Sequence, residues 1–279
     1  IVCVEEPTYF VIEKILQDHH LNISGIPIDS EGIIISDLRK KLESGLRPKF
    51  IYTIPTFQNP TGISLSTERR KQLLSLAEKY DFYIFADEVY QLLNFDIEPP
   101  SSLLNFDESN RVIEFGSFSK ILAPGLRTGW IQASQEIISR FTDAALTFSG
   151  GGFNHYTSVL INNFIELGYL DENIDFLKQT YSKRSEIVGN ALLKNFDDDI
   201  SFTHPQGGFY FWLQFTENFD AEKFLPVAEK HGVSFRPGNA FSASGFFSNN
   251  LRLTYTLYDS NSLTEGVKRL AKAYNEYSS

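Results

Sequence analysis

The sequence of 279 residues lacks methionine altogether and contains a single cysteine, Cys3. One cysteine excludes a disulfide framework within the chain and is typical of proteins from a reducing compartment. We therefore expect a cytoplasmic protein, and the matrix of an organelle is equally compatible with this composition. The first residues, IVCVEEPTYF, have the apolar, β-branched character of a buried strand. With no initiator methionine before them, we expect that an N-terminal segment precedes Ile1.

Positive charge and long apolar runs are also scarce. The chain has 25 Lys and Arg residues against 35 Asp and Glu residues, which gives a net charge of −10. Such a balance argues against nucleic acid or an anionic membrane as the main partner. No apolar run approaches the roughly 18 residues that a membrane span needs. The five histidines show no metal-ligand spacing, so we expect no metal site.

Apolar runs alternate with segments of helical periodicity in the first part of the chain. The runs predict strands at residues 1–4, 49–55, 82–90, 111–119 and 128–134, and the periodic segments predict helices within 7–20 and 64–81. This alternation predicts an α/β fold with a mostly parallel sheet and helices on both faces.

The pattern changes after residue 165. A long helix is predicted at 173–196, followed by strands at 207–215, 233–238 and 251–256 and a final helix at 264–277. We therefore predict a large domain over residues 1–185, with its N-terminal part missing, and a smaller α+β domain over 186–279.

Polar side chains gather where the predicted strands end, and parallel sheets bind their ligands at that edge. These residues are Asn59, Asp87, Tyr90, Ser117, Ser119 and Lys120.

Lys120 has the surroundings of a reactive lysine rather than of a solvated one. A neutral lysine amine attacks carbonyl groups, and a confined site favours the neutral form. The hydroxyl groups of Ser117 and Ser119, together with the guanidinium of Arg127, suit a phosphate group. The carboxylate of Asp87 suits a protonated ring nitrogen. Such a set of groups is what pyridoxal 5′-phosphate requires.

Four segments strengthen this interpretation. IPTFQNPTG, YIFADEVY, GSFSKILAPGLRTGW and NNLRLTYT resemble, in order and spacing, the signature segments of fold-type I aminotransferases of classes I and II. The chain is most similar to the kynurenine/2-aminoadipate aminotransferase branch of these enzymes. The resemblance implies an aminotransferase that moves an amino group from an aromatic or 2-aminoadipate-like amino acid to a 2-oxo acid such as 2-oxoglutarate.

The resemblance also implies a role for each site residue. Lys120 would form the Schiff base with the cofactor and carry the proton at the substrate α-carbon. Asp87 would hold the pyridine nitrogen protonated, and Asn59 and Tyr90 would bind the phenolic oxygen of the ring. Ser117, Ser119 and Arg127 would bind the phosphate, and Tyr9 would stack on the ring. Arg252, with Asn59, would bind the α-carboxylate of the substrate, and the family implies a homodimer.

Several alternatives remain open at this point. Asp87 and Glu88 could cap a following helix, Asn59 could serve only a turn, and Tyr9 could belong to the core. Arg252 lies on an alternating strand and could point to solvent, and Arg236 could be an exposed loop arginine. The function could also be that of a β-lyase acting on cystathionine or cysteine conjugates. A further alternative is the aminotransferase-like effector domain of a transcription regulator.

Overall fold

A seven-stranded sheet organises the first half of the chain, with strand order β3-β2-β1-β4-β5-β6-β7. The computed structural model describes residues 1–150 and 153–278, so residues 151–152 and 279 of the two predicted domains lie outside the description. The strands are β1 (Val2–Glu6), β2 (Ile23–Asp29), β3 (Gly32–Ile33), β4 (Phe50–Thr53), β5 (Tyr83–Asp87), β6 (Val112–Ser117) and β7 (Gly129–Gln132). The five central strands, which are β2, β1, β4, β5 and β6 in spatial order, run parallel, while the edge strands β3 and β7 are antiparallel to their neighbours. The expected fold class is therefore confirmed.

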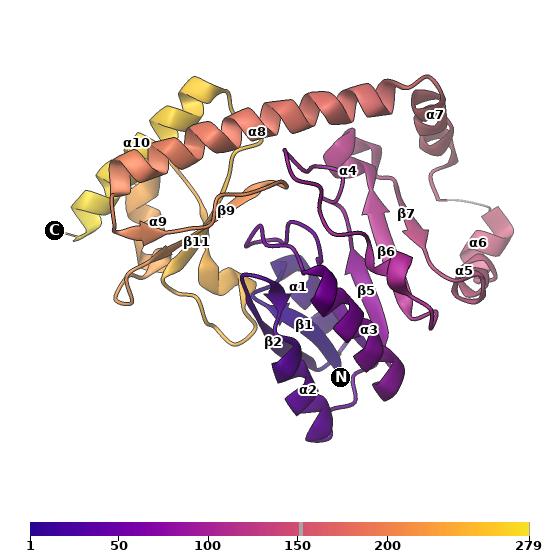
Figure 1. Cartoon of the computed structure of the whole chain (residues 1–279). Coiled ribbons are helices and arrows are strands. Elements are labelled where there is room, and N and C mark those ends of the chain that lie inside the picture. Colours follow the sequence, from indigo (N-terminus) through magenta and orange to yellow (C-terminus); the bar gives the residue numbers. More distant parts are fainter. Residues whose placement is uncertain (151–152, 279) are drawn as a thin grey trace.

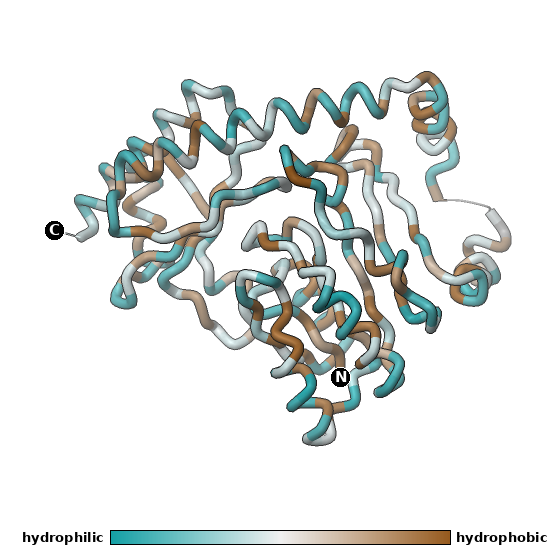
Figure 2. The backbone as a smooth tube through the Cα atoms, in the orientation of Figure 1, coloured by the Kyte–Doolittle hydropathy of each residue, from teal (hydrophilic) through white to brown (hydrophobic). Residues whose placement is uncertain are grey.

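Helices pack against both faces of this sheet because successive strand residues point to opposite sides. On one face, Cys3 and Ile51 pack with the apolar sides of α2 (Ile35–Glu43) and α3 (Thr67–Tyr80). On the other, Val4 and Tyr52 pack with α1 (Phe10–Asp18) and the first half of α8 (Tyr169–Phe196). The sheet strands are correspondingly hydrophobic in Figure 2.

A four-stranded antiparallel sheet, in the order β10-β11-β9-β8, forms the second core. Its strands are β8 (Ile200–Ser201), β9 (Tyr210–Phe215), β10 (Arg236–Pro237) and β11 (Asn250–Thr254). The helices α9 (Ala221–Lys230) and α10 (Ser260–Ser278) and the end of α8 cover it. Figure 1 shows the 28-residue helix α8 running across the top of both sheets. The division of the chain at residues 185 and 186, which falls within α8, stays a prediction.

The remaining elements are short helices at the edges. They are α4 (Phe118–Ile121), α5 (Gln135–Thr142), α6 (Ala145–Gly150), α7 (His155–Glu166) and the 3-10 turns η1 (Leu103–Phe106), η2 (Pro124–Leu126) and η3 (Gly238–Phe241). Among the helices that the structure describes, none is long and apolar enough to cross a membrane.

Candidate active site

The carboxyl ends of β4, β5 and β6 bring the predicted site residues to one edge of the large sheet. Asp87 is the last residue of β5 and pairs in register with Phe115 of β6. Ser117 ends β6 and caps α4, the single turn that carries Lys120. Because β5 and β6 are parallel neighbours, Asp87 and Lys120 leave the sheet at the same edge, as the sequence predicted.

Asp87 lies deep in this edge and is held by a residue that the sequence analysis missed. The hydroxyl of Tyr52, in β4, donates to Asp87 Oδ2 over 2.5 Å. Burial raises the pKa of Asp87, whereas the Tyr52 hydrogen bond and the charge of Lys120 lower it. The two effects that oppose burial come from a hydroxyl on the neighbouring strand β4 and from an ammonium on α4, the turn that follows β6.

Lys120 faces an aromatic wall supplied by the second half of the chain. Its Nζ lies 5.4 Å from the ring centroid of Phe209, which precedes β9. Phe209 also contacts the ring of Tyr90, with 5.3 Å between the centroids. A cation over an aromatic face is a favourable arrangement. The aromatic rings therefore hold the Lys120 amine on the side of the site where Tyr90 lies.

The serines predicted to hold a phosphate lie at the start of α4. Ser117 Oγ accepts a hydrogen bond from Ser119 N, 3.1 Å away, as the N-cap of this turn. The corner is tightly built, because a Cβ on Gly116 would lie 2.0 Å from the ring of Trp130. Only glycine lets β6 and β7 approach this closely at the residue before Ser117.

Arg127 lies near the end of β6, where Ser117 is placed. Ser117 pairs with Gly129, and Phe118 N donates to Thr128 O over 3.2 Å, so the two segments lie side by side. The Arg127 backbone has the left-handed φ of 51°. Its guanidinium is exposed and donates to Pro124 O over 3.2 Å. The structure thus places Arg127 next to the serines, with a side chain that bonds its own loop.

Arg252 points into the site and not to solvent. Its Nη1 donates to Asn59 Oδ1 over 2.6 Å, which joins the small sheet to the large one. The guanidinium carbon lies 4.0 Å from the centroid of the Tyr210 ring and 4.8 Å from that of Phe241. Burial lowers the pKa of Arg252, and the nearby hydroxyls of Tyr210 and Tyr90 act in the opposite direction.

Tyr9 and Tyr90 complete the group. The hydroxyl of Tyr90 lies 3.3 Å from that of Tyr210. Tyr9 precedes the first residue of α1 as its N-cap, and burial raises the pKa of its hydroxyl. The charges of Asp87 and Arg252 also act on this hydroxyl, so Tyr9 lies between the two sheets.

Tyr210, Phe209 and Phe241 were not identified from the sequence, although the alternation in GGFYFWLQF could have indicated that Tyr210 faces the site with Trp212.

The Asn59 segment is held by a buried carboxyl group. Glu5, in β1, accepts hydrogen bonds from Thr53 Oγ1 (2.6 Å), Ile54 N (3.1 Å) and Gln58 Nε2 (3.1 Å). Burial raises the pKa of Glu5 to about 7, and these three donors limit the increase. Asn59 itself is buried. Its orientation therefore depends on a network as well as on the turn chemistry of the NPTG sequence.

The helix-capping alternative for Asp87 and Glu88 is wrong. The residues after β5 form turns, with no helix for either carboxylate to cap. Glu88 is instead fully buried and accepts a 3.1 Å hydrogen bond from Arg70 Nη1, in α3. Arg70 also donates to the carbonyl groups of Leu65 and Pro55, at either end of the segment that carries Asn59.

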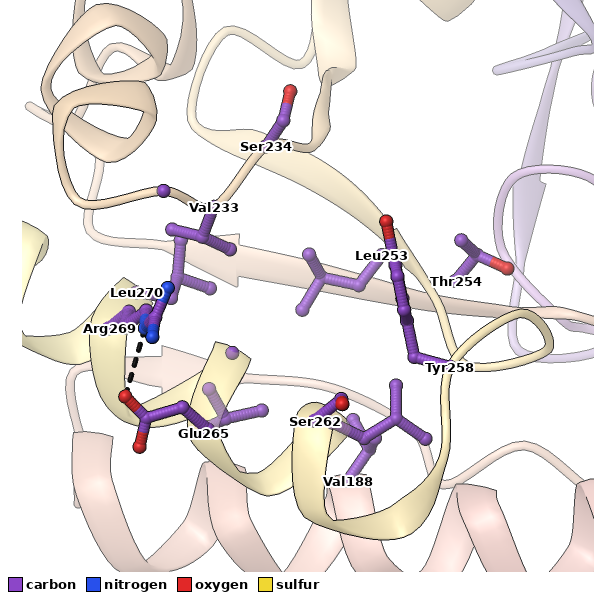
Figure 3. Close-up of a pocket in the computed structure, with 14 residues that line it drawn as sticks. Val188, Val233, Ser234, Leu253, Thr254, Tyr258, Ser262, Glu265, Arg269 and Leu270 are labelled. Atoms are coloured by element: carbon purple, nitrogen blue, oxygen red, sulfur yellow. Dashed lines mark hydrogen bonds and ion pairs between the residues drawn. The ribbon is translucent and has the colours of Figure 1, made fainter.

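A separate cavity of about 420 Å³ lies between α10 and the small sheet, away from these residues. Figure 3 shows Leu253 pointing into it, with the ion pair of Arg269 and Glu265 at one side. Leu253 follows Arg252 in β11, and successive strand residues point to opposite faces. The cavity and the candidate active site therefore lie on different faces of this sheet.

The comparisons with known proteins agree with this geometry. The family model described as "Aminotransferase class I and II" matches residues 1–270. The chain belongs to this family. Among its relatives, aromatic-amino-acid aminotransferase 1 of Thermococcus litoralis is 37% identical over 99% of this chain and 67% of its own length.

Solved structures and regulators also match. The kynurenine aminotransferase of Pyrococcus horikoshii, solved with PMP, superposes with a TM-score of 0.93 at 35% identity, covering 99% of this chain and 69% of that one. The uncharacterized HTH-type transcriptional regulator YisV of Bacillus subtilis is 29% identical over 98% of this chain and 55% of its own length. The chain thus spans between about half and about two thirds of the length of these proteins.

Pyridoxal 5′-phosphate is the cofactor of this family, and the residues present fit it. The half-buried carboxyl group of Asp87 suits a ring nitrogen, and the Ser117 and Ser119 hydroxyls at the N-terminal end of α4 suit a phosphate. Lys120 directly follows Ser119 in the sequence, and its Nζ lies over the ring of Phe209. The donor set is therefore of the right chemistry and occupies a single edge of the sheet.

Proposed function

We propose that the chain transfers an amino group from an amino acid to a 2-oxo acid, with 2-oxoglutarate as an acceptor. The observation that carries this proposal is the convergence of Asp87, Lys120 and Arg252. These three residues come from two parallel strand ends and from the second sheet, and Asn59 links Arg252 to the same edge. An aromatic or 2-aminoadipate-like donor fits the aromatic walls of Tyr210 and Phe209.

Each residue then has a chemical task. Bound pyridoxal phosphate supplies an electron-withdrawing ring that weakens the bonds at the substrate α-carbon. The Lys120 amine would take the proton from that carbon of the donor and, in the second half-reaction, would deliver a proton to the α-carbon that the 2-oxo acid contributes. Asp87 keeps the ring nitrogen protonated, and Tyr52 orients its carboxylate. Arg252 binds the α-carboxylate through its two forked N–H groups.

The remaining proposed ligands surround the cofactor. Asn59 and Tyr90 bind the phenolic oxygen, and Tyr9 stacks on the ring. Ser117, Ser119 and Arg127 bind the phosphate. The exposed Arg127 side chain would exchange its bond to Pro124 O for a phosphate oxygen.

A visible absorption spectrum of the protein with pyridoxal phosphate tests the proposal, beside a Lys120→Ala variant. We expect a band that requires Lys120 and bleaches with the donor amino acid, followed by its return on addition of 2-oxoglutarate. Release of pyruvate without an acceptor would indicate a β-lyase instead. A Lys120-dependent band that amino acids bleach without any turnover would favour the effector domain of a regulator.

We further propose that the chain forms a homodimer in the cytoplasm. Four large apolar residues on α6 and around the start of α7 are exposed: Leu146 (72%), Phe148 (80%), Phe153 (81%) and Tyr156 (83%). Exposed apolar surface of this kind marks an interaction site. The single cysteine supports a reducing compartment. Sedimentation of the protein and of a Tyr156→Lys variant tests the dimer, and we expect the variant to shift towards the monomer.

A further inference from the structure

A second arginine stands beside Arg252. Arg236, in β10, is paired directly with Arg252, in β11, in an antiparallel register. Residues directly opposite each other in such a pair share one face of the sheet, with Cα atoms about 4.5–5.5 Å apart. Both guanidinium groups therefore leave the face that looks towards the large sheet. The positive charge of Arg236 is among the causes that lower the pKa of Arg252, as expected for close neighbours.

Aromatic rings hold the two guanidinium groups at neighbouring positions. The Arg236 guanidinium carbon lies 5.0 Å from the ring centroid of Phe10, the residue after Tyr9. Phe10 contacts Phe241 edge to face at 5.6 Å, and the Arg252 guanidinium lies 4.8 Å from Phe241. The two cations thus lie along one aromatic surface that starts beside Tyr9. Arg236 is on the solvent side and is exposed, whereas Arg252 is more deeply buried.

Neither arginine has a carboxylate partner among the residues that the structure describes. This is unusual in a chain whose acidic residues outnumber its basic ones by ten, as the net charge of −10 records. Two adjacent, unneutralised guanidinium groups repel each other, and a ligand with two negative groups would relieve that repulsion.

We propose that Arg236 binds the distal carboxylate of a dicarboxylic substrate while Arg252 binds its α-carboxylate. This inference rests on the proposed transamination and specifies its substrate class. Five- and six-carbon dicarboxylic acids such as 2-oxoglutarate, glutamate and 2-aminoadipate carry two carboxylates joined by a short chain. Each matches one planar guanidinium fork. Monocarboxylic substrates engage Arg252 alone.

The test compares an acidic and a neutral acceptor with the same donor. We measure kcat/KM for 2-oxoglutarate and for pyruvate in the holoenzyme, in Arg236→Ala and Arg236→Lys, and in Arg39→Ala. Arg39 is an exposed arginine on α2, so its removal changes the net charge equally, away from the site. In Arg236→Ala we expect the ratio of 2-oxoglutarate to pyruvate kcat/KM to fall about 10- to 100-fold, the effect of losing hydrogen bonds to a charged group. Arg236→Lys should retain part of the ratio, and Arg39→Ala all of it.

A binding measurement separates this inference from the proposed function. Trp212 is paired with Arg252, and its ring lies 5.6 Å from Phe241, so its fluorescence reports on this surface. Glutarate should change the fluorescence of the protein without cofactor, and its dissociation constant should rise about 10-fold in Arg236→Ala. Failure of the unmodified protein to transaminate either oxo acid would overturn the proposed function alone. An unchanged acceptor ratio in active Arg236→Ala, or unchanged glutarate binding, would overturn the role of Arg236.

Discussion

Tyr52 lowers the pKa of Asp87 through one hydrogen bond, against the larger effect of burial. A hydroxyl that donates to a carboxylate stabilises its ionised form, and Asp87 needs that help because burial raises its pKa. In Tyr52→Phe we expect the pKa of Asp87 to rise, because the carboxylate loses its hydroxyl donor while burial still raises the pKa. The acid limit of pyridoxal phosphate binding should therefore shift to higher pH, measured as the dissociation constant by absorbance titration across pH.

Tyr83→Phe provides the matched control for this change. Tyr83 begins β5 and is partly exposed, so removing its hydroxyl takes away the same atom at the far end of the strand that carries Asp87. The control should bind the cofactor with the pH dependence of the unmodified protein. Identical profiles for both variants would show that Tyr52 does not set the charge of Asp87.

At the scale of single residues, the local sequence predicted some members of the candidate site and not others. Asp87, Ser117 and Lys120 were predicted as site residues because each lies at or just after the end of an apolar strand, a relation that the sequence itself contains. Tyr52 was not identified, because it lies within its strand and reaches Asp87 only through the pairing of β4 with β5. Glu88 was misread as a possible helix cap because its partner, Arg70, lies on another element.

At the scale of elements, α3 holds the Asn59 segment in place through a buried ion pair. Arg70 and Glu88 are both fully buried, and Arg70 bonds Leu65 O and Pro55 O as well. We expect Arg70→Met to lower the free energy of unfolding by about 3–5 kcal/mol, because it leaves the Glu88 carboxylate buried without its partner. Urea denaturation followed by circular dichroism measures this loss.

The double variant Arg70→Met/Glu88→Leu distinguishes the ion pair from packing. Replacing both partners with apolar residues removes the unpaired charge, so part of the lost stability should return. A double variant as unstable as Arg70→Met would mean that the bonds of Arg70 to the two carbonyl groups dominate.

The contact between β6 and β7 makes a second prediction at this scale. An alanine Cβ at position 116 would overlap the ring of Trp130, whereas one at Gly125 would meet no atom within 4 Å. Gly116→Ala should therefore lower the free energy of unfolding by about 1–3 kcal/mol, the usual cost of overpacking. Gly125→Ala, in the same Lys120 segment, should change it by less than about 0.5 kcal/mol. Thermal denaturation of the two variants compares them directly, and equal effects would contradict this account.

At the scale of the whole molecule, a glutamate of β1 and a glutamate of α1 bind the segment that follows η3. Glu6 accepts a hydrogen bond from Ser242 Oγ, Glu13 accepts one from the Ala243 backbone, and Thr8 N donates to Phe241 O over 2.9 Å. These three hydrogen bonds position Phe241 against Arg252. Burial, and then the charge of Glu6, raise the pKa of Glu13 to about 7.

The raised pKa of Glu13 makes the free energy of unfolding depend on pH. Between about pH 4.5 and 7 the folded protein keeps a proton on Glu13 that the unfolded chain has released, so its contribution to stability falls as the pH rises. Glu13→Gln removes this dependence. Relative to the unmodified protein, its free energy of unfolding should therefore increase from pH 5 to pH 8, as measured by urea denaturation at each pH. The exposed Glu43→Gln on α2 should show no such trend, and a constant difference for Glu13→Gln would contradict the prediction.

The sequence alone determined the fold class and the family, and it predicted a lysine, an aspartate and two serines as the residues that bind the cofactor. These depend on strand and helix periodicity and on short segments whose residues are neighbours along the chain. Only the tertiary structure decided that Tyr52 bonds Asp87, that Arg252 turns inward to Asn59, and that Arg236 stands beside Arg252. Those relations join residues that are far apart in the sequence, and strand pairing and the docking of the two sheets create them. The alternation of residues along a strand indicates which side chains share a face, whereas tertiary packing decides which element that face contacts.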